Sequence, residues 1–302
     1  MPNFIRSVSF SLCIGLAACS SKKGPVGNTE SLQGLQEMAY SGSNVDGSNN
    51  GKIREMAIRE TALSLGAQAG LAHRAKFIDE ELTKEARRLD TIYDFNALML
   101  PNNILPPVLL EGRNTLNLSE SSAIRISDRT YKISKQAKFV TTPPNWRQYL
   151  WMDYKKPDYP SVTLLPKTKE ERAVWDDCIR TGWKNGLEQA NIILEESLAR
   201  IKEDFTGMIL YRKLLAMNMI SEPFVSHTDL GITGDASEIH IDDRVLRITA
   251  LPALNTNSKD WRAAVSKDKN ALEAFKKMEK LASSAKIKIS SRAWQPMITP
   301  TS

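Results

Sequence analysis

Two long stretches of the chain carry apolar residues at the spacing of an α-helix. In residues 52–95, apolar or small side chains recur every three or four positions. One face of residues 57–75 is crowded with alanine and glycine, which permits close approach to another helix. Residues 168–220 repeat this spacing, and Thr168 and Glu171 at their start have the order of a capping box. The sequence therefore predicts a long helix in each stretch, and the low helix propensity of glycine predicts breaks in both. The glycines concerned are Gly66, Gly70, Gly182, Gly186 and Gly207.

Prolines and short strand-like segments follow each helical stretch. Prolines between residues 101 and 107 end the first helical pattern, and alternating apolar and polar positions in residues 108–142 then predict an antiparallel meander. Pro223 ends the second pattern, and residues 224–250 predict two or three strands with a turn near Asp242. The expected fold class is α+β, in which long helices pack with short antiparallel meander or hairpin segments. The repeated order of helix, proline and strands also hints at a duplication.

The first eighteen residues have the features of a secretory signal peptide. One Arg and the free amine precede an apolar run of roughly eleven residues, shorter than the about 20 that a membrane-spanning helix needs. The run ends in Leu16-Ala17-Ala18-Cys19, an order that resembles the lipobox of bacterial lipoproteins. We therefore expect cleavage between Ala18 and Cys19 and lipidation of the Cys19 thiol. The alternative is an ordinary signal peptide in which Cys19 occurs by chance.

The residues after this cysteine indicate how the protein is attached and where. Several acyl chains at Cys19 hold a protein at a membrane much more firmly than a single chain does. Ser20 is not acidic, which in lipoproteins usually permits export to the outer membrane. Residues 19–51 are rich in Ser, Gly and Asn and predict a lipidated flexible linker, interrupted near residues 32–40 by an apolar stretch that could dock as a helix. We expect a lipid-anchored protein on the periplasmic side of the outer membrane.

Composition and charge separate a folded body from a basic tail. The chain has 302 residues, of which 41% are hydrophobic and 25% charged, as in ordinary globular proteins. The whole chain has a net charge of +6, and residues 259–302 alone account for that excess. We expect an α+β body in residues 52–275, with halves 52–160 and 161–275 as an alternative, and a disordered tail in residues 276–302. The tail could bind an anionic surface, whereas the export signal argues against nucleic acid as a partner.

The sequence offers little catalytic chemistry. Three Cys are too few for a disulfide scaffold or a cysteine zinc cluster, and Cys178 is predicted to be buried. His227 with Asp229, and His240 with Asp242, could form a metal site if their strands faced each other, but exposed strand positions explain them better. His73 is expected to be structural. Gly-x-Ser-x-Gly, P-loop and His-Glu-x-x-His motifs are absent. We therefore predict no catalytic residue, no cofactor and no metal.

Several long strings of residues resemble a known family. They are Leu89-Asp90-Thr91-Ile92-Tyr93-Asp94-Phe95-Asn96-Ala97-Leu98-Met99-Leu100-Pro101, residues 104–112, residues 142–150, and Trp175-Asp176-Asp177-Cys178-Ile179-Arg180-Thr181-Gly182-Trp183 with its continuation to Phe205. With these strings the chain resembles the DotC family of lipoproteins from Dot/Icm type IVB secretion systems, over residues 32–275. The resemblance implies an outer-membrane protein that works with DotD to bring DotH to that membrane, in a core complex that also contains DotF and DotG. Of the family's functional residues, only the lipidated cysteine carries over, onto Cys19.

These observations give two hypotheses for function. The first is a non-catalytic lipoprotein scaffold of a type IVB secretion core complex, which assembles the conduit for effector export. The alternative is a periplasmic lipoprotein enzyme or binding module that acts on peptidoglycan, with its Trp residues lining a glycan groove. Trp side chains more often fill cores or anchor protein interfaces.

Overall fold

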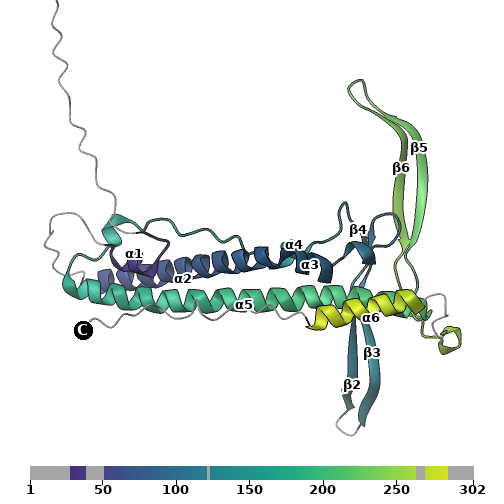
Figure 1. Ribbon diagram of the computed structural model, residues 1–302, viewed down its shortest axis with the longest axis horizontal. Helices are drawn as coiled ribbons and strands as arrows, with labels where there is room; N and C mark the ends of the chain where they lie inside the picture. Colours follow the sequence, from purple (N-terminus) through teal and green to yellow (C-terminus); the bar gives the residue numbers. More distant parts are fainter. Residues whose placement is uncertain (1–27, 39–50, 121–122, 263–268, 285–302) are drawn as a thin grey trace, which may run out of the picture.

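Two parallel helices form the long axis of the molecule. The computed structural model of the protein describes residues 28–38, 51–120, 123–262 and 269–284. In it, α2 (Gly51–Lys84) and α5 (Lys169–Ala216) lie side by side along most of their length (Figure 1). At about 1.5 Å per residue, the 48 residues of α5 extend over about 72 Å. The α+β fold class is confirmed, because antiparallel hairpins accompany these helices.

Glycines join the two long helices instead of breaking them. A Cβ atom on Gly66 would lie 2.5 Å from the carbonyl oxygen of Ile179, and one on Gly186 would lie 2.1 Å from that of Ala67. Gly70 and Gly182 meet the opposite backbone in the same way. The predicted breaks are therefore wrong: each missing side chain lets the two backbones touch, and this packing outweighs the low helix propensity of glycine.

Local capping explains where α5 begins and ends. The Thr168 hydroxyl accepts a hydrogen bond from the N–H of Glu171 at 3.2 Å, which confirms the predicted capping box. At the other end, Asn218 has a φ of 56°, the left-handed conformation common just after a helix. The axis that α5 provides is thus one uninterrupted helix between two defined caps.

Two β-hairpins project from one end of the helix pair, toward opposite sides (Figure 1). One pairs β2 (Val108–Glu120) with β3 (Ala123–Lys135), and the other pairs β5 (Phe224–Gly234) with β6 (Ile239–Ala250). The expected meander is therefore a hairpin, because β4 (Lys138–Phe139) pairs with β1 (Ile104–Leu105) and not with β3.

The turn between β5 and β6 differs from the predicted one. It is closed by the Asp235 carboxylate, which accepts hydrogen bonds from the N–H groups of Ser237 and Glu238. Asp242 lies within β6 and has a φ of 58° near an irregularity in the strand pairing. Asp242, in the left-handed conformation, thus marks a bulge within the strand, whereas the sequence predicted a turn at this position.

The core runs along the helix pair and crosses the alternative boundary at residues 160 and 161. At one end, α1 (Leu32–Gln36) is docked as expected, and Trp175 Nε1 donates to the carbonyl oxygen of Leu35 at 2.9 Å. In the middle, Phe95 and Trp146 pack in the same cluster as Phe205 of α5. Residues from both proposed halves share these clusters, so the described body is one packed unit.

A sixth helix corrects the expected tail. α6 (Lys269–Ser284) packs against α5, with Phe275 and Met278 against the central core and Ala282 fully buried. Residues 276–284 are therefore helical, although the sequence predicted a disordered tail. The apolar stripe at helical spacing that indicates this helix lies within a strongly basic composition, which concealed it. The remaining helices are short: α3 (Ala86–Ile92), α4 (Trp146–Leu150), η1 (Asn96–Leu98), η2 (Val162–Leu164) and η3 (Ser258–Asp260).

The membrane-related predictions fall on other residues. The signal peptide, Ala18, Cys19 and most of the 19–51 linker lie outside the described residues. Within the described ranges, none of the helices combines the length and the apolar character that a membrane crossing requires.

Candidate assembly surfaces

The outer parts of both hairpins expose large apolar side chains. In the β5–β6 hairpin, Ile232 and Ile241 are 73% and 74% exposed, and Ile239 is also exposed. In the β2–β3 hairpin, Ile126 is 67% exposed, with Leu116 directly opposite it and also exposed. A two-stranded hairpin without a covering layer is at best marginally stable in water. Exposed apolar side chains on such an element are typical of a surface that a protein partner covers.

The hairpins also leave strand edges open. Each of β2, β3, β5 and β6 pairs with a single strand among the described residues, so each presents one row of backbone N–H and C=O groups without a strand partner. Proteins normally protect such edges, because they are templates for pairing with another chain. Edges and apolar side chains together make the two hairpins the candidate assembly surfaces of this molecule.

A buried acid fixes the base of the β2–β3 hairpin on α5. Asp204 is only 4% exposed, and its carboxylate accepts from Lys135 Nζ at 2.6 and 2.7 Å and from the Tyr149 hydroxyl at 2.9 Å. Burial and the nearby Asp204 carboxylate raise the pKa of Tyr149 above its usual value, so its hydroxyl keeps the proton that it donates. Nearby, Gly207 lets β2 cross close to the helix, since a Cβ there would lie 2.7 Å from the Leu109 carbonyl oxygen. The hairpin therefore starts from a rigid platform.

The β5–β6 hairpin is fixed by apolar packing and by the chain that follows it. Val225 and Ile248 lie opposite each other at its base and pack against the core cluster that contains Tyr211 and Leu214. After β6, the N–H of Asn255 donates to the carbonyl oxygen of Met219 at 2.9 Å. Only the base of this hairpin is thus half-buried, and its outer part projects from the body (Figure 1).

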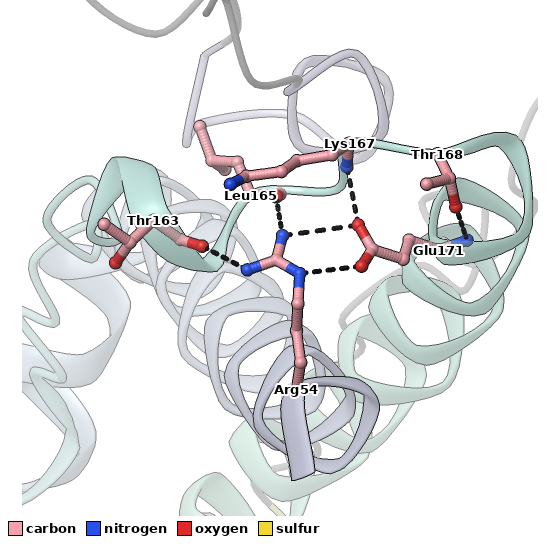
Figure 2. A network of polar contacts seen from close by, with 6 residues as sticks. All are labelled: Arg54, Thr163, Leu165, Lys167, Thr168 and Glu171. Carbon is pink, nitrogen blue, oxygen red and sulfur yellow. Dashed lines mark hydrogen bonds and ion pairs between the residues drawn. The ribbon is translucent and has the colours of Figure 1, made fainter. Parts of the chain in front are cut away.

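At the opposite end of the axis, an ion pair holds the starts of α2 and α5 together. Figure 2 shows Arg54 between Glu171 and the backbone of the incoming chain: its Nε lies 2.7 Å from Glu171 Oε1, and it donates to the carbonyl oxygens of Thr163 and Leu165. Burial acts to raise the pKa of Glu171, but hydrogen bonds from Arg54 and the N–H of Lys167 outweigh it and lower that pKa below its ordinary value. This cluster stabilises the helix pair rather than forming an open site.

An open cavity of about 740 Å³ lies beside α2. Trp151 and Tyr154 line it together with His73 and several charged side chains, and Glu30 pairs with Lys156 at 2.8 Å among the lining residues. The aromatic lining is what a glycan groove would need. However, the carboxylate of Asp79, which could serve chemistry there, accepts hydrogen bonds from the N–H groups of Met152 and Asp153. Its role is therefore to hold the backbone of this wall.

The candidate metal pairs are not brought together. His227 and Asp229 lie opposite Leu246 and Arg244 in the hairpin register, and His240 lies opposite Thr233. All four candidate side chains, Asp242 included, are exposed. Across the part of the chain that the structure describes, three or more His, Cys, Asp or Glu side chains nowhere gather as a metal site would require.

Cys178 is buried, as predicted, whereas His73 lies on an exposed part of α2 beside the open cavity. His73 is partly shielded against Trp183, with ring centroids 5.2 Å apart, and burial followed by the charges of Lys76 and Arg74 lowers its pKa. Cys178 is buried, and this burial raises the pKa of its thiol. Both pKa shifts favour the neutral form of the side chain.

Sequence reasoning missed the residues that organise this architecture. Asp204 and Arg54 carry no local signature, because their partners lie 69 and 117 residues away. The glycine contacts did leave a signal: Gly66 and Gly70, like Gly182 and Gly186, are spaced four residues apart, which places each pair on one face of its helix. The close approach expected from the small-residue face of residues 57–75 is therefore confirmed, and the matching spacing of Gly182 and Gly186 identifies α5 as the other helix.

A comparison with protein families gives the broader context. Residues 52–263 match the TraI family, whose description is type IV secretory system, conjugal DNA-protein transfer. The matched range contains both long helices and both hairpins. A search of the curated proteins finds no match for the chain.

Proposed function

Because this chain belongs to the TraI family of type IV secretory systems, we propose that it is a non-catalytic scaffold of the DotC type in a type IVB secretion core complex. In this proposal, the protein assembles with DotD, recruits DotH to the outer membrane, and joins a conduit that includes DotF and DotG. The observation that carries it is the family match, which spans both helices and both hairpins. The resemblance of several long strings to DotC lipoproteins supports the finer assignment.

Physical features of the chain support a scaffold more than an enzyme. The helix pair provides a rigid axis of about 72 Å, and the hairpins carry exposed apolar side chains at one end of it. Interfaces of assemblies need such apolar surface at their centres. A lipid at Cys19 and the linker of residues 19–51 would hold the body near the membrane and raise its effective concentration toward other anchored proteins.

A pull-down from detergent-solubilised envelopes tests this proposal. The expected result is stoichiometric recovery of DotD and DotH together with DotF and DotG. Recovery of the protein alone, combined with measurable glycan cleavage, would overturn the scaffold and support the peptidoglycan enzyme. Recovery alone without cleavage would also overturn it.

The lipid anchor is tested by Cys19→Ser. Since the acyl chains at this residue are the proposed attachment, the membrane-bound fraction should fall at least about tenfold while the body stays folded by circular dichroism. Cys178→Ala is the matched control: it changes the other cysteine of the cleaved chain, and the protein should stay bound. Membrane retention of the Cys19→Ser variant, or an unmodified Cys19 thiol by intact mass, contradicts the lipid anchor.

A further inference from the structure

The two hairpins carry opposite net charges. The β2–β3 hairpin, residues 108–135, has five Lys or Arg against three Asp or Glu, which gives +2. The β5–β6 hairpin, residues 224–250, has two Arg against five Asp or Glu, which gives −3 with histidine neutral. Lys135 is engaged by Asp204 at the base, so the outer basic groups of β3 are Arg125, Arg129 and Lys132. Complementary potentials of this kind direct one surface toward another.

These outer charges have no ionic partners within the described parts of the molecule. None of its ion pairs involves Arg125, Arg129 or Lys132 of β3, and none involves Asp229 or Asp242 of the other hairpin. All five side chains are exposed. They are therefore available to a partner, unlike the charges of Arg54, Glu171 and Asp204, which are used within the fold.

The charged residues alternate with exposed apolar ones in both hairpins. On β3, Arg125 lies between Ile124 and Ile126, and on β6, Asp242 directly follows Ile241. Because successive side chains of a strand point to opposite faces, Arg125 and Arg129 lie on the face opposite Ile124 and Ile126, whose own face also carries the exposed Asp128. The excess charge is basic on β3 and acidic on the β5–β6 hairpin. If β3 of one copy pairs along the open edge of the other hairpin, isoleucines become cross-strand neighbours on one face and opposite charges become neighbours on the other.

The shape of the molecule indicates that the basic hairpin in contact with the acidic hairpin comes from a second copy of the chain. The hairpins project to opposite sides of the helix pair, so they face away from each other within one chain (Figure 1). A second copy can bring its basic hairpin to the acidic hairpin of the first. A symmetric contact of the acidic hairpin with itself would place like charges together, which opposes association.

We propose that the β5–β6 hairpin of one copy binds the β2–β3 hairpin of a second copy. The contact is head-to-tail, so it leaves one hairpin free at each end of a pair and extends into a ring or an open chain. Copies anchored side by side in one membrane would favour it, and to that extent it rests on the proposed function. The partner is a second copy of this chain; a different protein on these hairpins is an outcome that the test would reveal.

Disulfide trapping in envelopes tests this contact with the full chain. The background is Cys178→Ala, and the two test changes are Ile126→Cys on β3 and Ile241→Cys on β6. A chain carrying both should give a ladder of dimers, trimers and larger species, and co-expression of the two single variants should give heterodimers only. Homodimers from a single variant, cross-links only to a different protein, or no cross-links would each overturn the proposal.

Charge reversal provides the second test and controls for altered folding. Arg125→Glu with Arg129→Glu, or Asp229→Lys with Asp242→Lys, should each reduce the ladder about tenfold, because attractive pairs become repulsive. All four changes in one chain should restore at least half of the yield. Arg87→Glu, at an exposed position of α3, is the matched control and should leave the ladder unchanged. A reduction that the combined variant does not rescue counts against the contact.

The outcomes for this contact and for the proposed function can be told apart. A ladder without recovery of DotD or DotH in the pull-down would leave the hairpin contact standing and overturn the scaffold assignment. Recovery of DotD and DotH without a ladder would overturn the hairpin contact and leave the scaffold assignment standing.

Discussion

The helix pair and the outer hairpins differ in how their apolar side chains are treated: those of the helix pair are buried, and those of the hairpins are exposed. Between α2 and α5, glycines on both helices have no side chain and so let the backbones come into contact. Large apolar residues on either side of this contact are fully buried. On the outer hairpins, large isoleucines remain, and most of their surface faces solvent. The core of the helix pair is therefore complete within one molecule, whereas the isoleucines of the outer hairpins stay exposed in it. Substitutions in the two regions should consequently affect different measurements.

The largest effect is expected where the helices touch. Gly186→Leu places a side chain where even a Cβ would lie 2.1 Å from the Ala67 carbonyl oxygen. Neither backbone can move without separating the helices, so the free energy of unfolding should fall by about 3 kcal/mol or more, as in severe overpacking. Urea unfolding followed by circular dichroism measures it.

The same change at the start of α2 is the control for that experiment. Gly51 has no neighbouring atom within 4 Å of its potential Cβ, so Gly51→Leu should alter the free energy of unfolding by less than about 0.5 kcal/mol. Equal effects of the two substitutions would show that the close helix contact contributes nothing particular to stability.

A smaller, pH-dependent effect is expected at the ion pair that joins the starts of the helices. Glu171→Gln keeps the size of the side chain but removes the charge paired with Arg54, so stability at pH 7 should fall by about 1 to 2 kcal/mol. The pKa of Glu171 is lowered in the folded protein. Its contribution is therefore present above the ordinary pKa of glutamate and is lost as the pH falls through the lowered value.

The difference between the wild type and Glu171→Gln should thus shrink as the pH is lowered from 7 to 3. Denaturant titrations at several pH values measure this. Glu55→Gln, which breaks the exposed pair with Arg59, is the control and should cost less than about 0.5 kcal/mol throughout. A difference for Glu171→Gln that stays constant down to pH 3 would contradict the role of its ionised form.

The sequence predicted the elements of this fold better than their relations. Periodicity identified both long helices, and the Thr168 cap was correct because capping depends on residues only three positions apart. The glycine breaks were wrong because propensity describes an isolated helix, whereas Gly186 is governed by Ala67 on another helix. The helical part of the tail was missed because its charge concealed the stripe of Phe275, Met278 and Ala282.

The candidate surfaces were harder to predict, for a physical reason. Alternation along residues 108–135 and 224–250 indicates strands, but it cannot indicate whether another layer covers them. Ile126 and Ile232 would have the same pattern on the inner face of a sandwich. The exposure of these side chains depends on the arrangement of whole elements, which alternation does not determine. The opposite charges of the hairpins indicate a contact between copies only because the hairpins face away from each other in the structure.

The smallest effect on stability is expected on the hairpins, and it sharpens the comparison between the two regions. Ile232→Thr changes a side chain that is 73% exposed, so the free energy of unfolding should change by less than about 0.5 kcal/mol. The same change at Ile209, which is fully buried on α5, should cost about 2 kcal/mol or more, because it removes packing and buries a hydroxyl. Thermal and urea unfolding of the two variants compare their stabilities directly.

The yield of cross-linked ladder in envelopes should respond differently. Ile232→Thr should lower this yield although the body is as stable as the wild type. If Ile232→Thr instead destabilised the body as much as Ile209→Thr, the hairpin would belong to the core of the single molecule, and its isoleucines would need no partner.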